Sequence, residues 1–326
     1  MAAGARSDET SARSSALGSN FDNPESRRKP HRELLFGYPI RHSLAPLLHS
    51  TLFRSNGLPW TFELHETQDA SEILPTLKAP GVVGCAVTMP YKVAMMSFVD
   101  EVTEEGQMIG AINTVYLRRA TDGRTRYIGT NTDCLGIRES FLRNFPDLPD
   151  QAFNKPALVI GAGGACRAAI YALWKWLGTS RVYIVNRLES EVAVIINWFK
   201  AVGCPIEILH VSSIEQAALL ETPVLVVGTV PDITPKNPGE ILCRNIISTF
   251  LTGPKKGYIL EMCYHPIPRT EFFNLGEKAG WKMLYGTEAL IWQGVAQQAL
   301  WMELPQDSFK LEEVHKVVSN AIEHNK

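Results

Sequence analysis

The chain has 326 residues, more than one ordinary hydrophobic core accommodates, so two domains are expected. Its composition is that of a globular protein, with 45% hydrophobic residues, 20% charged residues and a formal net charge of −2, and it lacks the clustered positive charge of a nucleic-acid-binding protein. The sequence contains no apolar run of the roughly 18 residues that a transmembrane helix needs, so no membrane association is expected.

The six cysteines are scattered through apolar runs and form no CxxC pair. We therefore predict neither a metal site nor a disulfide framework, and we expect a reducing, cytoplasmic location. Residues 1–32 are rich in Ser, Ala, Arg and Gly and lack the apolar stretch of a signal peptide, while their acidic residues argue against a mitochondrial transit peptide. We interpret this segment as a disordered tail without a role in catalysis.

The first ordered part of the chain has an α/β pattern. Apolar residues predict strands over 34–40, 60–64 and 82–88, with helices over 47–55 and 70–77 between them. Ser43 precedes the first of these helices. It either caps the helix or helps the free N–H groups there to hold a carboxylate, and both interpretations stay open. His42 is assigned no role.

Lys92 follows the third strand, which must end at Pro90 because proline cannot continue a ladder. The next four residues, 93–96, are apolar. A lysine held against apolar surface loses hydration and becomes a usable acid or base. The alternative is an exposed lysine that opens a helix over 93–102.

Two further polar side chains are predicted near strand ends. Asn113 belongs to a strand over 109–117, and Asp133 follows a hairpin strand over 126–130 and precedes a helix over 135–145. Each alone would be an ordinary turn former. Because strand ends line the ligand crevice of α/β sheets, Lys92, Asn113 and Asp133 together predict a site for a small polyhydroxylated molecule.

A Pro/Asp-rich linker over 146–156 leads into a dinucleotide-binding pattern. An apolar strand over 157–160 is followed by a glycine-rich turn, a helix over 166–177 and a second strand over 181–185. Such a turn, placed before a helix N-terminus, binds a pyrophosphate. The turn residues expected at the cofactor are Gly161, Ala162, Gly163, Gly164 and Ala165.

Asn186, Arg187 and Glu189 follow the second strand, where the adenosine ribose binds. Acidic side chains accept the ribose hydroxyls of NAD and repel the 2′-phosphate of NADP, whereas Arg187 could pair with that phosphate or stack on adenine. With Glu189 and Glu191 close by, NAD is favoured over NADP.

Three further strands, over 205–209, 223–227 and 257–261, extend this second sheet. Gly228 and Gly286 are expected near the cofactor. Gly286 also begins a helix that continues to Trp301, and Gln293 on this helix either bonds backbone or points at a ligand.

From about residue 34 to its end, the chain resembles the shikimate/quinate dehydrogenase family. The segments that match family motifs, in the family's order, are the Ser43 turn (Ser-x-Ser-Pro), Val87–Lys92 (Asn-Val-Thr-x-Pro-x-Lys), Gly110–Thr114, Asn131–Asp133, Gly161–Ala165 (Gly-Ala-Gly-Gly-Ala) and Gln293. The resemblance implies a two-domain α/β fold with the active site in the cleft between the domains. Residues 33–134 plus 287–326 would form the substrate-binding and catalytic domain, and residues 135–286 a Rossmann-type, doubly wound dinucleotide-binding domain.

The same resemblance implies that Lys92 and Asp133 form a catalytic dyad. The carboxylate would orient the lysine, and the lysine would relay the proton of the reacting hydroxyl while hydride passes to the nicotinamide. Ser43 would hold the substrate carboxylate, and Thr88, Asn113 and Gln293 the ring hydroxyls.

Two departures from the family pattern bear on the substrate. Ala45 stands where the family usually has a second serine, and Ala86 where it usually has asparagine. Each removes a hydrogen-bonding group and leaves room, which suits quinate because quinate carries an additional hydroxyl beside its carboxylate. In overall look the chain is similar to fungal quinate dehydrogenases. The implied reaction is NAD-dependent oxidation of quinate to 3-dehydroquinate, with shikimate as a second substrate.

Two alternatives stay open: an NADP-dependent shikimate dehydrogenase, and a non-catalytic metabolite sensor, which would have no need of Lys92 and Asp133. The only partner expected beyond the cofactor is the small-molecule substrate, and the chain is expected to be a monomer or a homodimer.

Overall fold

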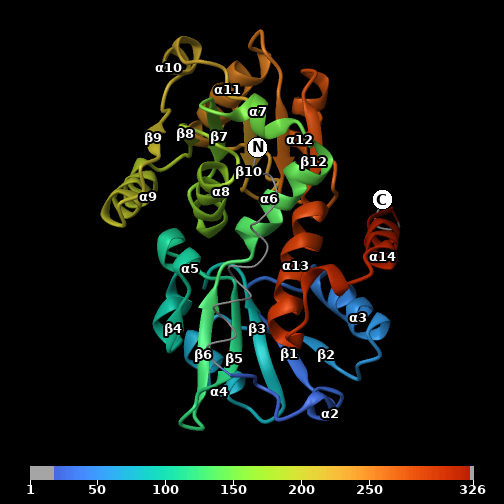
Figure 1. Ribbon diagram of the computed structural model, residues 1–326. Coiled ribbons are helices and arrows are strands. Elements are labelled where there is room, and N and C mark those ends of the chain that lie inside the picture. Colours follow the sequence, from blue (N-terminus) through green and yellow to red (C-terminus); the bar gives the residue numbers. More distant parts are fainter. Residues whose placement is uncertain (1–17, 324–326) are drawn as a thin grey trace. The chain divides into compact units, whose positions relative to one another are not determined.

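The computed structural model describes residues 18–323, which divide into two compact units. The first unit comprises residues 18–106, 112–130 and 294–318, and the second comprises 107–111, 131–293 and 319–323. Each unit is built on a six-stranded sheet of its own (Figure 1). This confirms the predicted α/β class with two domains.

The sheet of the first unit is mixed, with the strand order β2-β1-β3-β5-β6-β4. Its strands are β1 (Arg32–Gly37), β2 (Thr61–Glu66), β3 (Val82–Val87), β4 (Glu101–Val102), β5 (Thr114–Arg119) and β6 (Thr125–Thr130). β1 pairs in parallel with β2 and β3, while β5 runs antiparallel to both β3 and β6. The carboxyl ends of β1, β3 and β6 and the amino end of β5 therefore meet at one edge of this sheet.

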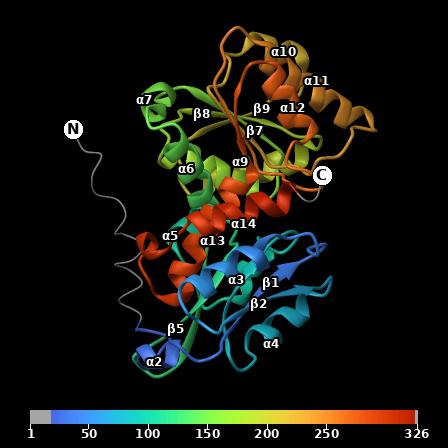
Figure 2. The ribbon, with the colours of Figure 1, turned by 90° about the vertical axis from the view of Figure 1, so that its right-hand side faces the viewer.

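Helices cover both faces of this sheet, and Figure 2 shows α3 (Ala45–Ser55) and α4 (Ile73–Leu77) on opposite sides of β1 and β2. On the α4 face, Ile73 packs in one apolar cluster with Leu34 and Phe36 of β1. On the α3 face, the His49 ring stacks on Phe62 of β2 with ring centroids 4.2 Å apart. The remaining short elements here are η1 (Ala70–Glu72), η2 (Ala94–Phe98), α5 (Glu104–Ile109, shared with the second unit) and η3 (Gln306–Ser308).

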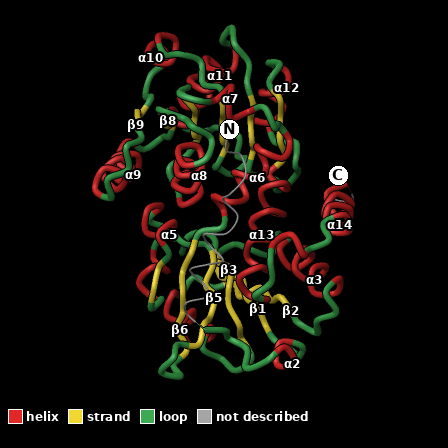
Figure 3. The backbone as a smooth tube through the Cα atoms, viewed as in Figure 1, coloured by secondary structure: helices red, strands yellow, loops and turns green. Residues whose placement is uncertain are grey.

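The sheet of the second unit is entirely parallel (yellow in Figure 3). Its strands are β7 (Pro156–Ile160), β8 (Arg181–Val185), β9 (Glu207–His210), β10 (Leu225–Gly228), β11 (Tyr258–Glu261) and β12 (Lys282–Tyr285), in the order β12-β11-β10-β7-β8-β9. From the β9 edge this is the 3-2-1-4-5-6 order of the Rossmann fold. The strand order reverses direction at β7, the strand that leads into the glycine turn.

Alternate residues of these strands belong to two apolar clusters, one on each face of the sheet. Ala157 and Val159 of β7 pack with α6 (Asp133–Asn144), α8 (Gly164–Lys175) and α9 (Glu189–Ala201). Leu158 and Ile160 pack with residues of the helices on the other face. Those helices are α10 (Ile214–Leu219), α11 (Pro238–Thr252) and α12 (Glu271–Lys278). Both faces are covered, as the continuous apolar runs of the strands predict.

Two long elements near the end of the chain are divided between the units. α13 (Gly286–Met302) contributes residues up to Gln293 to the second unit and the rest to the first, and α14 (Glu312–Glu323) is divided at residue 318. Within residues 18–323, no helix combines the length and the hydropathy that crossing a membrane requires.

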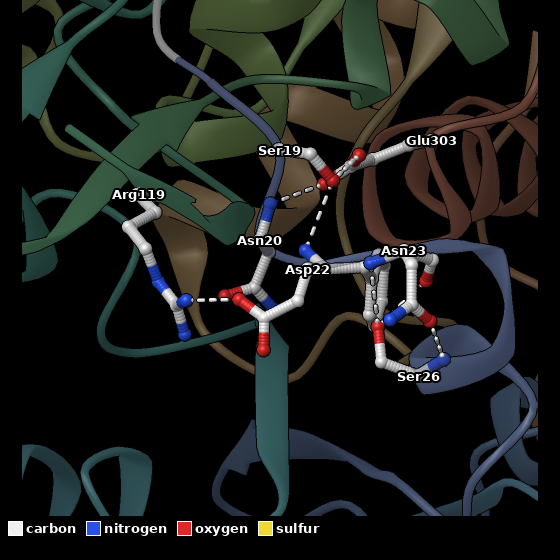
Figure 4. A network of polar contacts seen from close by, with 8 residues as sticks. Ser19, Asn20, Asp22, Asn23, Ser26, Arg119 and Glu303 are labelled. Atoms are coloured by element: carbon white, nitrogen blue, oxygen red, sulfur yellow. Dashed lines mark hydrogen bonds and ion pairs between the residues drawn. The ribbon is translucent and has the colours of Figure 1, made fainter. Parts of the chain in front are cut away.

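Residues 18–31, which the composition assigned to a disordered tail, are ordered on the first unit (Figure 4). The Asn20 N–H donates to Glu303 Oε1 at 2.7 Å, and the Phe21 ring lies 5.8 Å from that of Trp60, with Phe21 only 8% exposed. The prediction of disorder is wrong for this segment. The buried Phe21 ring and the hydrogen bond of Asn20 to Glu303 hold this otherwise polar stretch on the first unit. The segment includes the short helix α2 (Pro24–Arg27), while residues 1–17 of the predicted tail lie outside the described residues.

Three other local predictions are corrected by the structure. The helix predicted over 93–102 is a 3-10 turn, η2, followed by β4, because residues 101–102 pair with β6 instead of continuing a helix. The strand predicted over 109–117 begins only at Thr114, after α5. The linker predicted over 146–156 contains a short helix, α7 (Leu148–Ala152).

Candidate active site

Thr88, Lys92 and Asn113 lie at the same edge of the first unit's sheet. The Val87 N–H donates to the Asn113 carbonyl at 2.7 Å, and the Ile112 N–H donates to the Lys92 carbonyl at 2.8 Å. These two bonds tie the segment after β3 to the residues that lead into β5. The structure therefore brings together three of the predicted site residues that belong to this unit.

Ser43 lies in the loop between β1 and α3. The Tyr38 N–H at the start of this loop donates to the Met89 carbonyl at 2.9 Å, which holds the loop beside the segment that follows β3. The Ser43 hydroxyl oxygen accepts the Ala45 N–H at 3.2 Å, at the first turn of α3. Ser43 thus contacts the helix start, and its O–H hydrogen is a donor that this contact does not use.

The side chain of Asn113 is held by its buried neighbour Thr114, which Gln297 holds in turn. The Thr114 hydroxyl donates to Asn113 Oδ1 at 2.8 Å, and Gln297 Nε2 donates to Thr114 Oγ1 at 3.0 Å. All three side chains are buried. The sequence reasoning missed Thr114 and Gln297, because only the fold brings residue 297 of α13 to the start of β5.

Asp133 is the first residue of α6 in the second unit and is 7% exposed. Asn131 fixes the turn that precedes it, donating through Nδ2 to the Ala111 carbonyl at 2.9 Å and accepting the Cys134 N–H at 3.3 Å. The carboxylate therefore stands at a helix N-terminus, where a negative charge is stabilised.

Gln293 lies beside the same turn. Its Oε1 accepts the Thr132 hydroxyl at 3.4 Å, and its Nε2 donates to the Leu290 carbonyl at 3.2 Å. The structure thus brings Gln293 next to the residue that precedes Asp133. Lys92 belongs to the first unit and Asp133 to the second, so their action as a dyad stays a prediction.

The glycine turn joins β7 to α8 in the second unit. Gly161 has φ +109°, a backbone conformation that L side chains rarely adopt, and a Cβ there would lie 2.7 Å from Thr229 Oγ1. Gly163 is the N-cap residue of α8, it makes no side-chain cap, and a Cβ built on it would have no neighbour within 4 Å. An uncapped helix N-terminus behind an open turn fits a pyrophosphate, whose oxygens would accept the free N–H groups.

The residues that follow β8 are held by polar contacts. Asn186 Nδ2 donates to Glu191 Oε2 at 2.8 Å, while Arg187 forms an ion pair with Glu240 of α11 at 3.0 Å. The N–H of Lys236 and its neighbours hold the pKa of Glu240 below its ordinary value. The sequence reasoning considered only the nearby acidic residues, and no spacing signal places Glu240 beside Arg187.

Gly228 and Gly286 both make close approaches to protein atoms around Glu261. A Cβ on Gly228 would overlap the Glu261 carboxylate, and one on Gly286 would overlap the Met262 carbonyl. Glu261 is 2% exposed, its Oε1 accepts the Cys263 N–H at 2.9 Å, and burial raises its pKa to about 8. These contacts explain both glycines within the fold, and their role at a cofactor stays a prediction.

Comparisons with known proteins identify relatives of this chain. The shikimate dehydrogenase substrate binding domain family matches residues 35–115, which include Ser43, Thr88, Lys92 and Asn113. The chain is 44% identical over 283 residues to the quinate dehydrogenase of Emericella nidulans, an alignment that covers 82% of this chain and 86% of that protein.

Two solved structures extend the comparison. The dehydroquinate dehydratase and shikimate dehydrogenase chain of S. pombe AroM is 34% identical with a TM-score of 0.68, over 86% of this chain and about half (52%) of that one. The shikimate 5-dehydrogenase of Thermus thermophilus, in complex with NADP(H) and shikimate, is 28% identical with a TM-score of 0.66, over 84% of this chain and 94% of that one.

Proposed function

Because the chain belongs to the shikimate/quinate dehydrogenase family, we propose that it is an NAD-dependent quinate dehydrogenase that oxidises quinate to 3-dehydroquinate. The family membership confirms the resemblance inferred from the motifs and makes the protein an oxidoreductase. The observation that carries the choice of substrate is the 44% identity to a quinate dehydrogenase over 86% of that protein's length.

In this proposal Lys92 and Asp133 move the proton of the reacting hydroxyl. As the C–H bond of the alcohol carbon breaks and its electron pair leaves as hydride, the hydroxyl proton passes to Lys92 and from there to water, leaving the ketone. Asp133 orients the lysine through its carboxylate. A nicotinamide dinucleotide supplies the hydride acceptor.

The remaining polar residues would bind and orient the substrate. Thr88 and Asn113 lie at the same sheet edge as Lys92, so they are suited to holding ring hydroxyls next to the reacting carbon. Ser43 would hold the carboxylate and Gln293 a further hydroxyl. Fixing the ring in this way converts binding energy into correct orientation for hydride transfer.

The preference for quinate is supported by two small residues. Ala86 and Ala45 have no hydrogen-bonding group in their side chains, at positions where the family usually has a polar side chain, and both are buried. Ala86 faces the same side of the sheet as Gly84, where a Cβ would meet Trp301 of α13. In this proposal, the smaller side chains at these two positions would leave space beside the substrate carboxylate for the additional hydroxyl of quinate.

For the cofactor, the open glycine turn at Gly161–Ala165 would hold the pyrophosphate on the N-terminus of α8. NAD is proposed over NADP because Arg187, the cation placed to meet a 2′-phosphate, is already paired with a carboxylate. The six cysteines are all free thiols, as a reducing compartment favours, and the proposal places the enzyme in the cytoplasm.

An NADP-dependent shikimate dehydrogenase is the second candidate. It is favoured by the 28% identity to the Thermus thermophilus enzyme, which was solved with NADP(H) and shikimate, and by the presence of Arg187 itself. The sensor alternative has no observation in its favour, since Lys92, Asp133 and the glycine turn are all retained.

The experiment that tests the proposal is a panel of kcat/KM values for quinate and shikimate, each with NAD and with NADP. The proposal predicts the highest value for quinate with NAD. A clear preference for shikimate with NADP would establish the second candidate instead, and no turnover of either acid would support the sensor.

A further inference from the structure

Arg187 and Glu240 form an ion pair whose geometry is set by the start of α11. Arg187 Nη1 donates to Glu240 Oε1 at 3.0 Å, and the other carboxylate oxygen, Oε2, accepts the Lys236 N–H at 2.9 Å. Asn237 caps the same helix, its Oδ1 accepting the Glu240 N–H at 3.0 Å. The carboxylate therefore belongs to a capping box and is not a freely rotating surface group.

Packing of the helix start against the turn after β8 fixes the pair further. A Cβ on Gly239 would lie 3.6 Å from Cβ of Arg187 and 3.8 Å from its carbonyl oxygen. The first turn of α11 thus rests on the backbone of Arg187. Glu240 reaches the guanidinium because the fold holds it there, 53 residues along the chain from Arg187.

Arg187 lies where a dinucleotide-binding sheet contacts the adenosine ribose, so its ion pair bears on cofactor binding. Side chains just after the second strand of a dinucleotide-binding sheet meet the adenosine ribose, and an arginine there can bind the 2′-phosphate that distinguishes NADP from NAD. While it is paired with Glu240, Arg187 offers such a phosphate fewer N–H donors and a partly neutralised charge. The phosphate must also approach a carboxylate of the same sign, which specific sites use to reject a competing ligand.

We propose that Glu240 is the residue that sets cofactor preference, by holding Arg187 away from a 2′-phosphate and repelling that phosphate. This rests on the proposed function only in requiring that the second unit binds a nicotinamide dinucleotide. Glu191, one of the nearby acidic residues, accepts a hydrogen bond from Asn186. The carboxylate that engages Arg187 comes from α11.

The test is the variant Glu240→Gln, because glutamine keeps the capping box and the side-chain shape while removing the charge. Binding of adenosine 2′,5′-bisphosphate and of 5′-AMP to the full-length protein is measured by titration calorimetry at low ionic strength. We expect the variant to bind the 2′,5′-bisphosphate about tenfold more tightly, as one released charge-assisted hydrogen bond would allow. Its affinity for 5′-AMP should not change, and the gain should shrink as salt is added, because the pair is exposed to solvent.

A matched control lies at the other end of the same strand. Arg181 and Glu207 pair at 2.7 Å where β8 and β9 begin, on the edge of the sheet away from the glycine turn. Glu207→Gln removes an equivalent exposed ion pair and should leave both affinities unchanged. In Glu240→Gln/Arg187→Ala the gain for the 2′,5′-bisphosphate should disappear.

An unchanged preference in Glu240→Gln, or an equal gain in Glu207→Gln, would overturn the inference. Neither nucleotide fragment involves quinate, so these outcomes are independent of the proposed substrate. If neither fragment bound the wild type or the variant, the dinucleotide site would be wrong, and the proposed cofactor would fall together with the inference.

Discussion

The Thr114 hydroxyl donates a hydrogen bond to Asn113 Oδ1 at 2.8 Å, and both side chains are buried. This bond holds the Asn113 amide in one orientation. Gln297 completes the arrangement by donating to Thr114 Oγ1 at 3.0 Å. The orientation of the Asn113 side chain thus depends on two residues that a substrate need not touch.

Thr114→Val should separate this positioning role from a general loss of stability. Valine has the same shape but neither donates to Asn113 nor accepts from Gln297, so we expect KM for quinate to rise about tenfold with a smaller change in kcat. The cost to the free energy of unfolding should be about 1–3 kcal/mol. Steady-state kinetics and thermal unfolding check both values. Thr114→Ser, which keeps the hydroxyl, should restore KM, and a folded valine variant with the wild-type KM would contradict the role.

The glycine turn offers two substitutions with opposite expected results. Gly161→Ala should destabilise the fold by about 1–3 kcal/mol, because alanine is strained at a positive φ and its Cβ would press on Thr229. Gly163→Ala meets no protein atom within 4 Å, so it should cost only the roughly 0.5–1 kcal/mol by which alanine is the poorer N-cap residue. If the pyrophosphate sits on this turn, Gly163→Ala should nevertheless weaken NAD binding about tenfold or more. Calorimetric NAD titration of both variants checks this, and undiminished affinity in Gly163→Ala would place the pyrophosphate elsewhere.

The raised pKa of Glu261 predicts how the stability of the fold depends on pH. Burial raises its pKa from 4.5 to about 8, so between these values the folded protein keeps a proton that the unfolded chain releases. The contribution of this group to stability therefore falls as pH rises through this window, by at most about 1.4 kcal/mol per pH unit. Glu261→Gln can still accept the Cys263 N–H but carries no titrating proton.

Urea unfolding of the wild type and Glu261→Gln is measured from about pH 5 to about pH 9, so that the range ends roughly one unit above the raised pKa of Glu261. Burial also raises the pKa of Glu33, so the informative quantity is the difference between the two proteins at each pH. We expect that difference to grow in favour of the variant up to about pH 8 and then to level off. Parallel stability curves would show that Glu261 does not titrate in this range.

Ala86→Asn tests the origin of the substrate preference. An asparagine at this buried position would supply the polar group that the family usually has there, and it would occupy the space that the proposal assigns to the additional hydroxyl of quinate. We expect the ratio of kcat/KM for shikimate over quinate to rise about tenfold, the effect of one gained or lost polar contact. Ala45→Ser is the companion variant at the other vacancy. An unchanged ratio in a folded Ala86→Asn protein would remove Ala86 from the explanation.

Features that depend on local sequence were predictable, and features that depend on long-range packing were not. The Gly161–Ala165 turn and the helix from Gly286 were recognised, because a strand, a turn and a helix leave their pattern in neighbouring residues. The helix predicted over 93–102 was wrong, because pairing with β6 overrides the local apolar pattern.

The residues that hold the site side chains in place come from distant parts of the sequence. Gln297 acts on Thr114 from 183 residues away, and Glu240 meets Arg187 across 53 residues, so neither contact has a spacing that a sequence could reveal. The ordering of residues 18–31 has the same cause, since Glu303 and Trp60 supply contacts that the composition of the segment does not show.

We propose that this protein oxidises quinate and that Lys92 relays the proton. The variant Lys92→Ala tests both points: NADH formation from quinate is followed for the wild type and the variant, and quinate binding to both proteins is measured in parallel. We predict measurable turnover by the wild type, and in the variant a loss of kcat of roughly 10²- to 10⁴-fold, typical of a missing general acid–base group, with quinate still bound. A folded variant that turns over quinate at the wild-type rate would exclude Lys92 as the proton relay.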